Sequence, residues 1–296
     1  NILSNGSYEL TRWRKDPFGI RLYRNDEYKG EFEAENAAVF LTCNDDEPIM
    51  TKLEKNSIDM AFIDCSLTKD AKALGLKTKE FQNICWFLTL GDDFSPNMRK
   101  ALSMLVGSQV YSNDLQTGYC AATSIFPEVI SKNVGATGMT VYNPQSSKQL
   151  YLSELERLEN KKFPVDAVLY YYDNGSMKAI VTDIVGHWQS NLSAFVNIES
   201  VSNADLLRSQ LIDAEYKMAF FPVRADSERP YEYLEKFGFT YNGEDLSAVQ
   251  TEILKSNNII PIMFQNTVIA YSPALSEVYA TNGDGYIDFS FIIKTE

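Results

Sequence analysis

Apolar runs of strand length alternate with amphipathic helical patterns in the second half of the chain. Strand-like runs cover residues 165–171 and 194–201 and start again at Met218, and helical patterns cover residues 180–188 and 204–214 between them. Consecutive strand-helix-strand units of this length usually place their strands parallel in one sheet. The pattern therefore predicts an α/β lobe with a mostly parallel sheet.

A second alternation precedes this one. A strand-like run at residues 37–41 is followed by a short helical pattern with Ile49, Met50 and Leu53 on its apolar face, and by another run at residues 58–63. We interpret these as a βαβ unit. At 296 residues the chain is long enough for two hydrophobic cores. We therefore expect two α/β lobes.

Other elements are predicted from periodicity and from helix start and stop signals. They are a hairpin of half-exposed strands within residues 5–25, strands at 84–88, 260–264, 267–271 and 286–293, and helices at 97–106, 146–161 and 245–256.

Composition and charge exclude some classes of partner. The hydrophobic fraction of 45% and the charged fraction of 23% are ordinary for a globular protein. The formal net charge of −13 repels phosphate backbones, so we expect no nucleic-acid partner. No run approaches the length of a membrane helix. The chain begins at Asn1 without Met, and we expect any export signal or lipid anchor to lie upstream.

The four cysteines, Cys43, Cys65, Cys85 and Cys120, are too scattered for a disulfide scaffold and form no C-x-x-C pair. Cys43 and Cys65 each follow a strand-like run. A disulfide between those two strands and free buried thiols are both compatible with this spacing.

A single histidine, His187, limits the catalytic motifs that the chain can hold. It lies in a helical pattern and not in a loop at a strand end, so neither a Ser-His-Asp or Cys-His arrangement nor a zinc motif is predicted. No glycine-rich phosphate loop occurs. We expect no metal and no cofactor. Carboxylate pairs for hydrolysis are recognised by their distance in space, so the 40 acidic residues leave that class open.

Asp226 lies just after the apolar run that starts at Met218, where a buried strand would end in a charged turn. Ligands of open α/β sheets bind outside the carboxyl ends of the strands, so this carboxylate is a candidate to receive a cation or an amino group. The alternative is structural: Asp226 pairs with Arg224 or Arg229, or caps a turn. Local sequence favours the structural alternative.

Six segments in chain order resemble one protein family. They are residues 6–10 (Gly-Ser-Tyr-Glu-Leu), 24–30, 53–64, 98–103 (Met-Arg-Lys-Ala-Leu-Ser), 218–234, which has Ala-Asp at positions 225 and 226, and 260–272, which resembles the family's return strands. In this order the segments resemble the extracytoplasmic solute-binding proteins of peptide and oligopeptide ATP-binding-cassette importers, known as family 5.

The resemblance implies a fold of the periplasmic-binding-protein type II kind, with two α/β lobes, mostly parallel sheets and crossing strands, which closes on its ligand like a hinge. Family chains are much longer, so this chain would match their C-terminal portion. Residues 93–259 would form lobe II nearly whole, and residues 1–92 with 260–296 a part of lobe I.

The resemblance also implies a function without covalent chemistry: a receptor that captures a peptide-like solute for the membrane permease of an importer. Such a receptor would be a monomer outside the cytoplasm, either a cell-surface lipoprotein or a periplasmic protein. Asp226 matches the aspartate that meets the peptide's amino terminus in the family, and Arg224 and Val223 lie beside it.

Pro222 and Val223 stand where the family has Gly-Trp. This departure leaves a second hypothesis, in which the same fold with a degenerate cleft serves a sensor or an adhesive surface protein. The third hypothesis is the carboxylate-dependent hydrolase.

Overall fold

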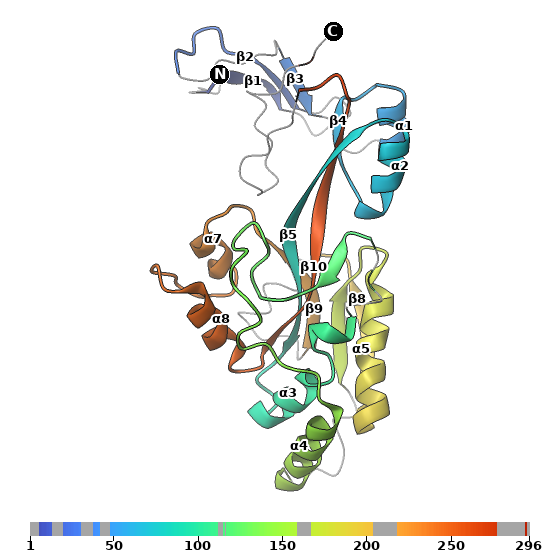
Figure 1. Cartoon of the computed structure of the whole chain (residues 1–296), viewed down its shortest axis with the longest axis vertical. Coiled ribbons are helices and arrows are strands. Elements are labelled where there is room, and N and C mark those ends of the chain that lie inside the picture. The colour runs from blue at the N-terminus through green and yellow to red at the C-terminus, as the bar shows by residue number, and fades with distance from the viewer. Residues whose placement is uncertain are drawn as a thin grey trace. The chain divides into compact units, whose positions relative to one another are not determined.

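The computed structural model describes residues 6–13, 20–30, 38–41, 48–111, 115, 117–158, 167–203, 218–276 and 294. The chain divides into two compact units (Figure 1). The first comprises Asn1–Phe81 with Thr267–Glu296, and the second comprises Gln82–Asn266.

The first unit holds a small antiparallel sheet in the order β1-β2-β3. Its strands are β1 (Tyr8–Trp13), β2 (Ile20–Arg24) and β3 (Ala38–Leu41). The predicted hairpin is confirmed, because β1 pairs antiparallel with β2. Asn25 ties its open end, since its backbone N–H donates to Ser7 O at 2.9 Å and its side chain donates to Gly6 O at 3.1 Å.

The predicted βαβ unit is wrong. The helix α1 (Ile49–Glu54) and the strand β4 (Met60–Ile63) form, but β3 pairs antiparallel with β2 and β4 pairs antiparallel with β10 (Ile259–Tyr271). The two strands therefore belong to different sheets. A short apolar run does not reveal its partner, and the partner of β4 lies some two hundred residues further along the chain. After β4 come the short helices η1 (Cys65–Leu67) and α2 (Thr68–Ala73).

Within the described residues, the main sheet has seven strands, in the order β4-β10-β5-β9-β7-β8, with β6 paired to β10. The strands not yet introduced are β5 (Lys77–Leu90), β6 (Tyr119–Ala121), β7 (Val168–Tyr172), β8 (Asn197–Val201) and β9 (Met218–Arg224).

The expectation of mostly parallel sheets is wrong. Among the described strands, β7 is parallel to β8 and to β9, as the strand-helix-strand pattern predicts. By contrast, β5 is antiparallel to β9, and β10 is antiparallel to β4 and β6. A strand buried on both faces is a continuous apolar run whatever its direction, so its sequence does not distinguish the two arrangements.

Two long strands replace several short predicted ones. β5 has 14 residues and β10 has 13, and β10 unites the strands predicted at 260–264 and 267–271. Residues 263–265 of β10 pair with β6, and residues 268–271 pair with β4. The polar pair Gln265-Asn266, which suggests a turn in the sequence, is part of the strand, and Gln265 Oε1 accepts a hydrogen bond from Trp86 Nε1 at 2.8 Å.

The helices of the second unit agree with their sequence signals. They are α3 (Pro96–Ser103), η2 (Ser108–Tyr111), α4 (Pro144–Arg157), α5 (Met177–Leu192), α7 (Pro230–Glu235) and α8 (Leu246–Leu254). The side chains of Ser95, Asn143 and Asp245 cap α3, α4 and α8 by accepting backbone N–H groups of the first turn. Proline occupies the first turn of α3 and of α4, where it costs no hydrogen bond.

Both faces of the sheet in this unit are buried. Trp86 and Phe220 lie in a core with residues of α3, α4 and α5, whereas Phe87 and Phe221 lie in a second core with residues of α7 and α8. Figure 1 shows α5 on one side of the strands and α7 and α8 on the other. The two cores follow from the alternation of side chains along β5 and β9.

Three predictions concern residues that lie outside the described part of the chain: the helix at 204–214, the strand at 286–293 and the state of Cys43. Cys85 is a buried free thiol and Cys120 an exposed one. In the described residues, no helix has the length and apolarity that crossing a membrane requires.

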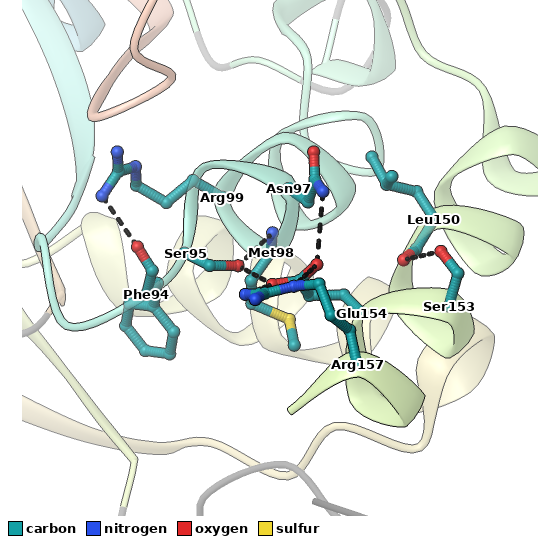
Figure 2. A network of polar contacts seen from close by, with 9 residues as sticks. All are labelled: Phe94, Ser95, Asn97, Met98, Arg99, Leu150, Ser153, Glu154 and Arg157. Carbon is teal, nitrogen blue, oxygen red and sulfur yellow. Dashed lines mark hydrogen bonds and ion pairs between the residues drawn. The ribbon is translucent and has the colours of Figure 1, made fainter. Parts of the chain in front are cut away.

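A buried carboxylate joins α3 to α4. Glu154 of α4, whose side chain is 2% exposed, accepts hydrogen bonds from Ser95 Oγ, from Asn97 Nδ2 at 3.2 Å and from both Nε and Nη2 of Arg157 at 3.0 and 2.6 Å (Figure 2). Ser95 also caps α3, so the same hydroxyl serves the helix start and the carboxylate. The hydrogen bonds from Arg157 and then from Ser95 lower the pKa of Glu154 from its usual 4.5 to about 2.

We expect Glu154→Gln to lower the free energy of unfolding by about 1–3 kcal/mol at pH 7, because charged hydrogen bonds are lost. Since the folded pKa lies below the unfolded one, this contribution is complete above pH 4.5 and is lost as the pH falls towards 2. Urea unfolding at several pH values tests this. The exposed Glu156 of the same helix offers the control Glu156→Gln, which should change stability by less than about 0.5 kcal/mol. Equal effects of the two substitutions would contradict the assignment.

Candidate ligand-binding site

The parallel strands β7, β8 and β9 end at one edge of the sheet, and β9 extends furthest along it. Tyr171 of β7 is opposite Phe220, whereas β9 continues to Arg224, which is opposite Ile84 of β5. Just past the strand, Ala225 N donates to Asn83 O at 2.7 Å. This bond fixes the backbone immediately before Asp226. The edge is of the kind at which open α/β sheets bind ligands.

The three residues predicted for the site differ in exposure. The side chains of Arg224 and Asp226 are 43% and 45% exposed. Val223 is fully buried in the core that faces α7 and α8, because successive residues of a strand point to opposite faces. Solvent therefore reaches Arg224 and Asp226 and not Val223. Their roles in binding stay predictions.

Asp226 is paired with two cations. Its Oδ2 accepts a short hydrogen bond from Lys236 Nζ, and its Oδ1 lies 3.9 Å from Arg224 Nε. The structural alternative is thus present for Arg224. It is absent for Arg229, which binds Glu232 at 3.0 Å instead.

Lys236 is the residue of this cluster that the sequence did not single out. It follows the last residue of α7 and is ten positions from Asp226, so local spacing does not connect the two. A basic residue at a helix C-terminus commonly complements the helix dipole. This position was the only feature of the sequence that could have drawn attention to Lys236. In the fold, Lys236 Nζ also donates to Arg224 O at 2.6 Å, and its side chain is only 18% exposed.

The turn between Asp226 and α7 is closed by its own polar groups. Glu232 accepts hydrogen bonds from Ser227 Oγ and from Arg229 Nη1, and these, with Ser227 first, lower its pKa. Arg229 N donates to Ser227 Oγ at 3.2 Å. Arg229 and Glu232 are therefore bonded within the turn, whereas Glu228 is exposed, and the carboxylate of Asp226 lies at the strand end itself.

The helix α7 is rigidly anchored behind the turn. Tyr233 is 1% exposed, and its hydroxyl donates to Ile125 O at 2.8 Å. Its ring packs edge to face against Phe237, with 5.3 Å between the ring centroids. Leu234 is fully buried. Gly238, with a φ of 74°, ends the chain segment in the left-handed region that suits glycine. The backbone of Lys236 is thus held in place by a packed core.

A polar turn follows β7 at the same edge. Asp173 Oδ1 accepts from Gly175 N at 2.9 Å, and Asn174 Oδ1 accepts from the Ser176 hydroxyl at 2.9 Å. Asn174 Nδ2 reaches Tyr119 OH at 3.3 Å. Asp173 and Asn174 are thus bonded within the turn, and Asp173 is a second carboxylate at this edge of the sheet.

A hollow of about 220 Å³ lies within the second unit, on the loop that follows β6. Its polar lining includes Gln82, Ser124 and the ion pair between Lys132 and Glu128, whose N···O distance is 2.6 Å. Gln82 is engaged on both sides, since its amide donates to Cys120 Sγ and accepts from Glu128 N. The polar groups of the hollow mostly satisfy one another.

The described residues contain no group of three or more histidine, cysteine, aspartate or glutamate side chains that could hold a metal ion. His187 lies on α5, as predicted, with Nε2 3.4 Å from Asp183 Oδ2. Its ring lies edge to face with that of Tyr142, with 6.2 Å between the ring centroids. It is thus a helix residue with a structural neighbour.

Several solved structures share this mixed α/β fold. The substrate-binding protein CtaP of Listeria monocytogenes matches with a TM-score of 0.74 and 16% identity over 99% of this chain and 67% of its own. The DppA protein of Helicobacter pylori, solved with the peptide STSA, matches with a TM-score of 0.71 and 16% identity. This match covers 98% of this chain and 63% of the DppA chain. A dipeptide-binding protein of Pseudoalteromonas, solved with Met-Leu, matches with a TM-score of 0.73 and 14% identity. This match covers 98% of this chain and 64% of the other chain.

The chain thus spans about two thirds of the length of these structures. No curated relative matches it in sequence. The model of the middle region of the bacterial extracellular solute-binding proteins, family 5, matches residues 1–245. Because this match covers most of the chain and the fold agrees with it, the chain belongs to the family 5 extracellular solute-binding proteins.

Proposed function

We propose that the protein is an extracytoplasmic receptor that captures a peptide-like solute and delivers it to the membrane permease of an ATP-binding-cassette importer. The observation that carries the proposal is the half-exposed carboxylate of Asp226 at the carboxyl end of β9, in a chain of this family. The DppA and Pseudoalteromonas structures hold a peptide and a dipeptide, which supports a ligand of this class.

In this proposal Asp226 receives the amino group of the ligand. A carboxylate has about four lone-pair positions. Lys236 uses one oxygen, and the other faces Arg224 only at 3.9 Å. A charge-assisted bond from a ligand ammonium is stronger than a neutral one, and it would fix one end of the peptide.

Arg224 and Val223 have supporting roles in the proposal. Arg224, whose side chain is 43% exposed, is placed to donate to a carbonyl or carboxylate oxygen of the ligand. Val223 acts from within the core, where its packing holds the end of β9 from which Arg224 and Asp226 extend.

The proposed lobe II, residues 93–259, lies within the second compact unit, Gln82–Asn266. The remaining residues, 1–92 and 260–296, are proposed as part of lobe I. We also propose that the protein acts as a monomer at the cell surface or in the periplasm, with or without a lipid anchor. The description of the family as extracellular supports the location.

Mass spectrometry of small molecules that copurify with the protein tests the class of ligand. We expect peptides to be released on denaturation, in an amount comparable to the protein. A protein that copurifies with nothing would favour the sensor or adhesive surface protein. Turnover of an added panel of peptides or glycans would favour the carboxylate-dependent hydrolase.

Calorimetric titration tests the role of Asp226. We expect Asp226→Asn to weaken the binding of peptides with a free amino terminus by about 1 to 3 kcal/mol, because a charged hydrogen bond is lost. Asp183→Asn on the surface of α5 is the control for the loss of one charge and should leave the affinity unchanged. Equal affinities of Asp226→Asn and the wild type would contradict the assignment.

A further inference from the structure

The ammonium of Lys236 is already hydrogen-bonded to Asp226, the carboxylate that a ligand's amino group would bind. Lys236 Nζ is bonded to Asp226 Oδ2 and, at 2.6 Å, to Arg224 O. At 18% exposure, the side chain of Lys236 is much less accessible than Asp226 at 45%. The carboxylate is therefore open to solvent on one side and closed by a partly desolvated cation on the other.

The charges around Asp226 do not balance. One carboxylate lies between the cations of Lys236 and Arg224, so the cluster is net positive. In the turn that follows, Glu232 is engaged with Ser227 and Arg229, and the side chain of Glu228 is exposed. A ligand ammonium that approaches Asp226 thus meets repulsion from two like charges together with the attraction of one carboxylate.

We propose that Lys236 is a specificity-determining residue of the site: it competes with the ligand's amino group for Asp226 and lowers the affinity for peptides with a free amino terminus. The inference rests on the proposed function, in which Asp226 receives that amino group. It adds that Lys236 competes with the ligand's amino group. The affinity for peptides whose amino end is uncharged is not lowered by this competition.

The geometry allows Lys236 to yield without loss of the fold. An ammonium has three donors, so release of Asp226 leaves the bond to Arg224 O intact. The backbone of Lys236 is held by Tyr233 and Phe237 in the core, and the flexible four-carbon stem alone has to move. The competition therefore involves a side-chain rearrangement and not an opening of α7.

A purely structural role for Lys236 makes the opposite prediction. If Lys236 mainly orients Asp226 for the ligand, removal of its charge leaves the carboxylate less ordered, and free-amino peptides bind more weakly. If Lys236 competes, removal of its charge makes them bind more tightly. The direction of the change separates the two roles.

The test compares free and blocked amino termini on the same protein. A random tetrapeptide library, half of it N-acetylated, is equilibrated with the full chain, and retained peptides are quantified by mass spectrometry. We expect Lys236→Met, which keeps an apolar stem, to raise the ratio of retained free-amino to acetylated peptides about tenfold, as for one charged hydrogen bond. Asp226→Asn with Lys236→Met should return the ratio to near one.

Two control variants separate charge from packing. Lys236→Arg keeps the cation and should leave the ratio at the wild-type value. Lys255→Met removes a different exposed ion pair, with Glu252 at 3.5 Å, and should also leave it unchanged. Thermal unfolding of each variant confirms that the chain is folded before the library is added.

The outcomes distinguish this inference from the proposed function. If wild type and Lys236→Met retain peptides with the same ratio, or if the ratio falls in Lys236→Met, the competition is refuted while the peptide receptor stands. If no variant retains any peptide, the proposed function fails and the competition fails with it.

Discussion

The antiparallel pairing of β5 with β9 is the contact on which the rest of the second unit depends. It runs from Ile84 opposite Arg224 to Leu90 opposite Met218. Because side chains alternate along both strands, the pair supplies large aromatic residues to two cores, one on each face of the sheet. Each such side chain stabilises the fold by about 1.5–3 kcal/mol through burial. The same pairing determines where β9 ends, and so where Asp226 leaves the sheet.

The site combines a backbone frame held by packing with charged side chains that extend from it. The frame consists of the end of β9, tied by the bond from Ala225 N to Asn83 O, and of α7, tied by the buried hydroxyl of Tyr233. On this frame Asp226 and Lys236 extend as side chains with rotatable bonds. Rearrangement of such groups requires much less free energy than movement of a packed helix, so the proposed selectivity depends on charge and not on a change of fold.

Features that depend on neighbours in the chain were predictable. Helix starts at Ser95, Asn143 and Asp245 are local, since a side chain caps the backbone three residues away, and the parallel β7-α5-β8 unit follows from its connection. The antiparallel partners of β4 and β9 were not predictable, because apolar runs do not encode direction. For the site, the position of Asp226 after a strand was predictable, and its pairing with Lys236 was not, because that contact spans a turn and a helix.

The sequence by itself thus determined the elements, their approximate order in two α/β units, the strand end that carries Asp226 and the resemblance to family 5 solute-binding proteins. These depend on periodicity, capping and motif order, which are local or additive along the chain. Only the tertiary structure decided the direction of the sheet, the burial of Val223 and the pairing of Asp226 with Lys236. Each of these arises from contacts between segments distant in the chain, because strand pairing and ion pairing depend on position in space.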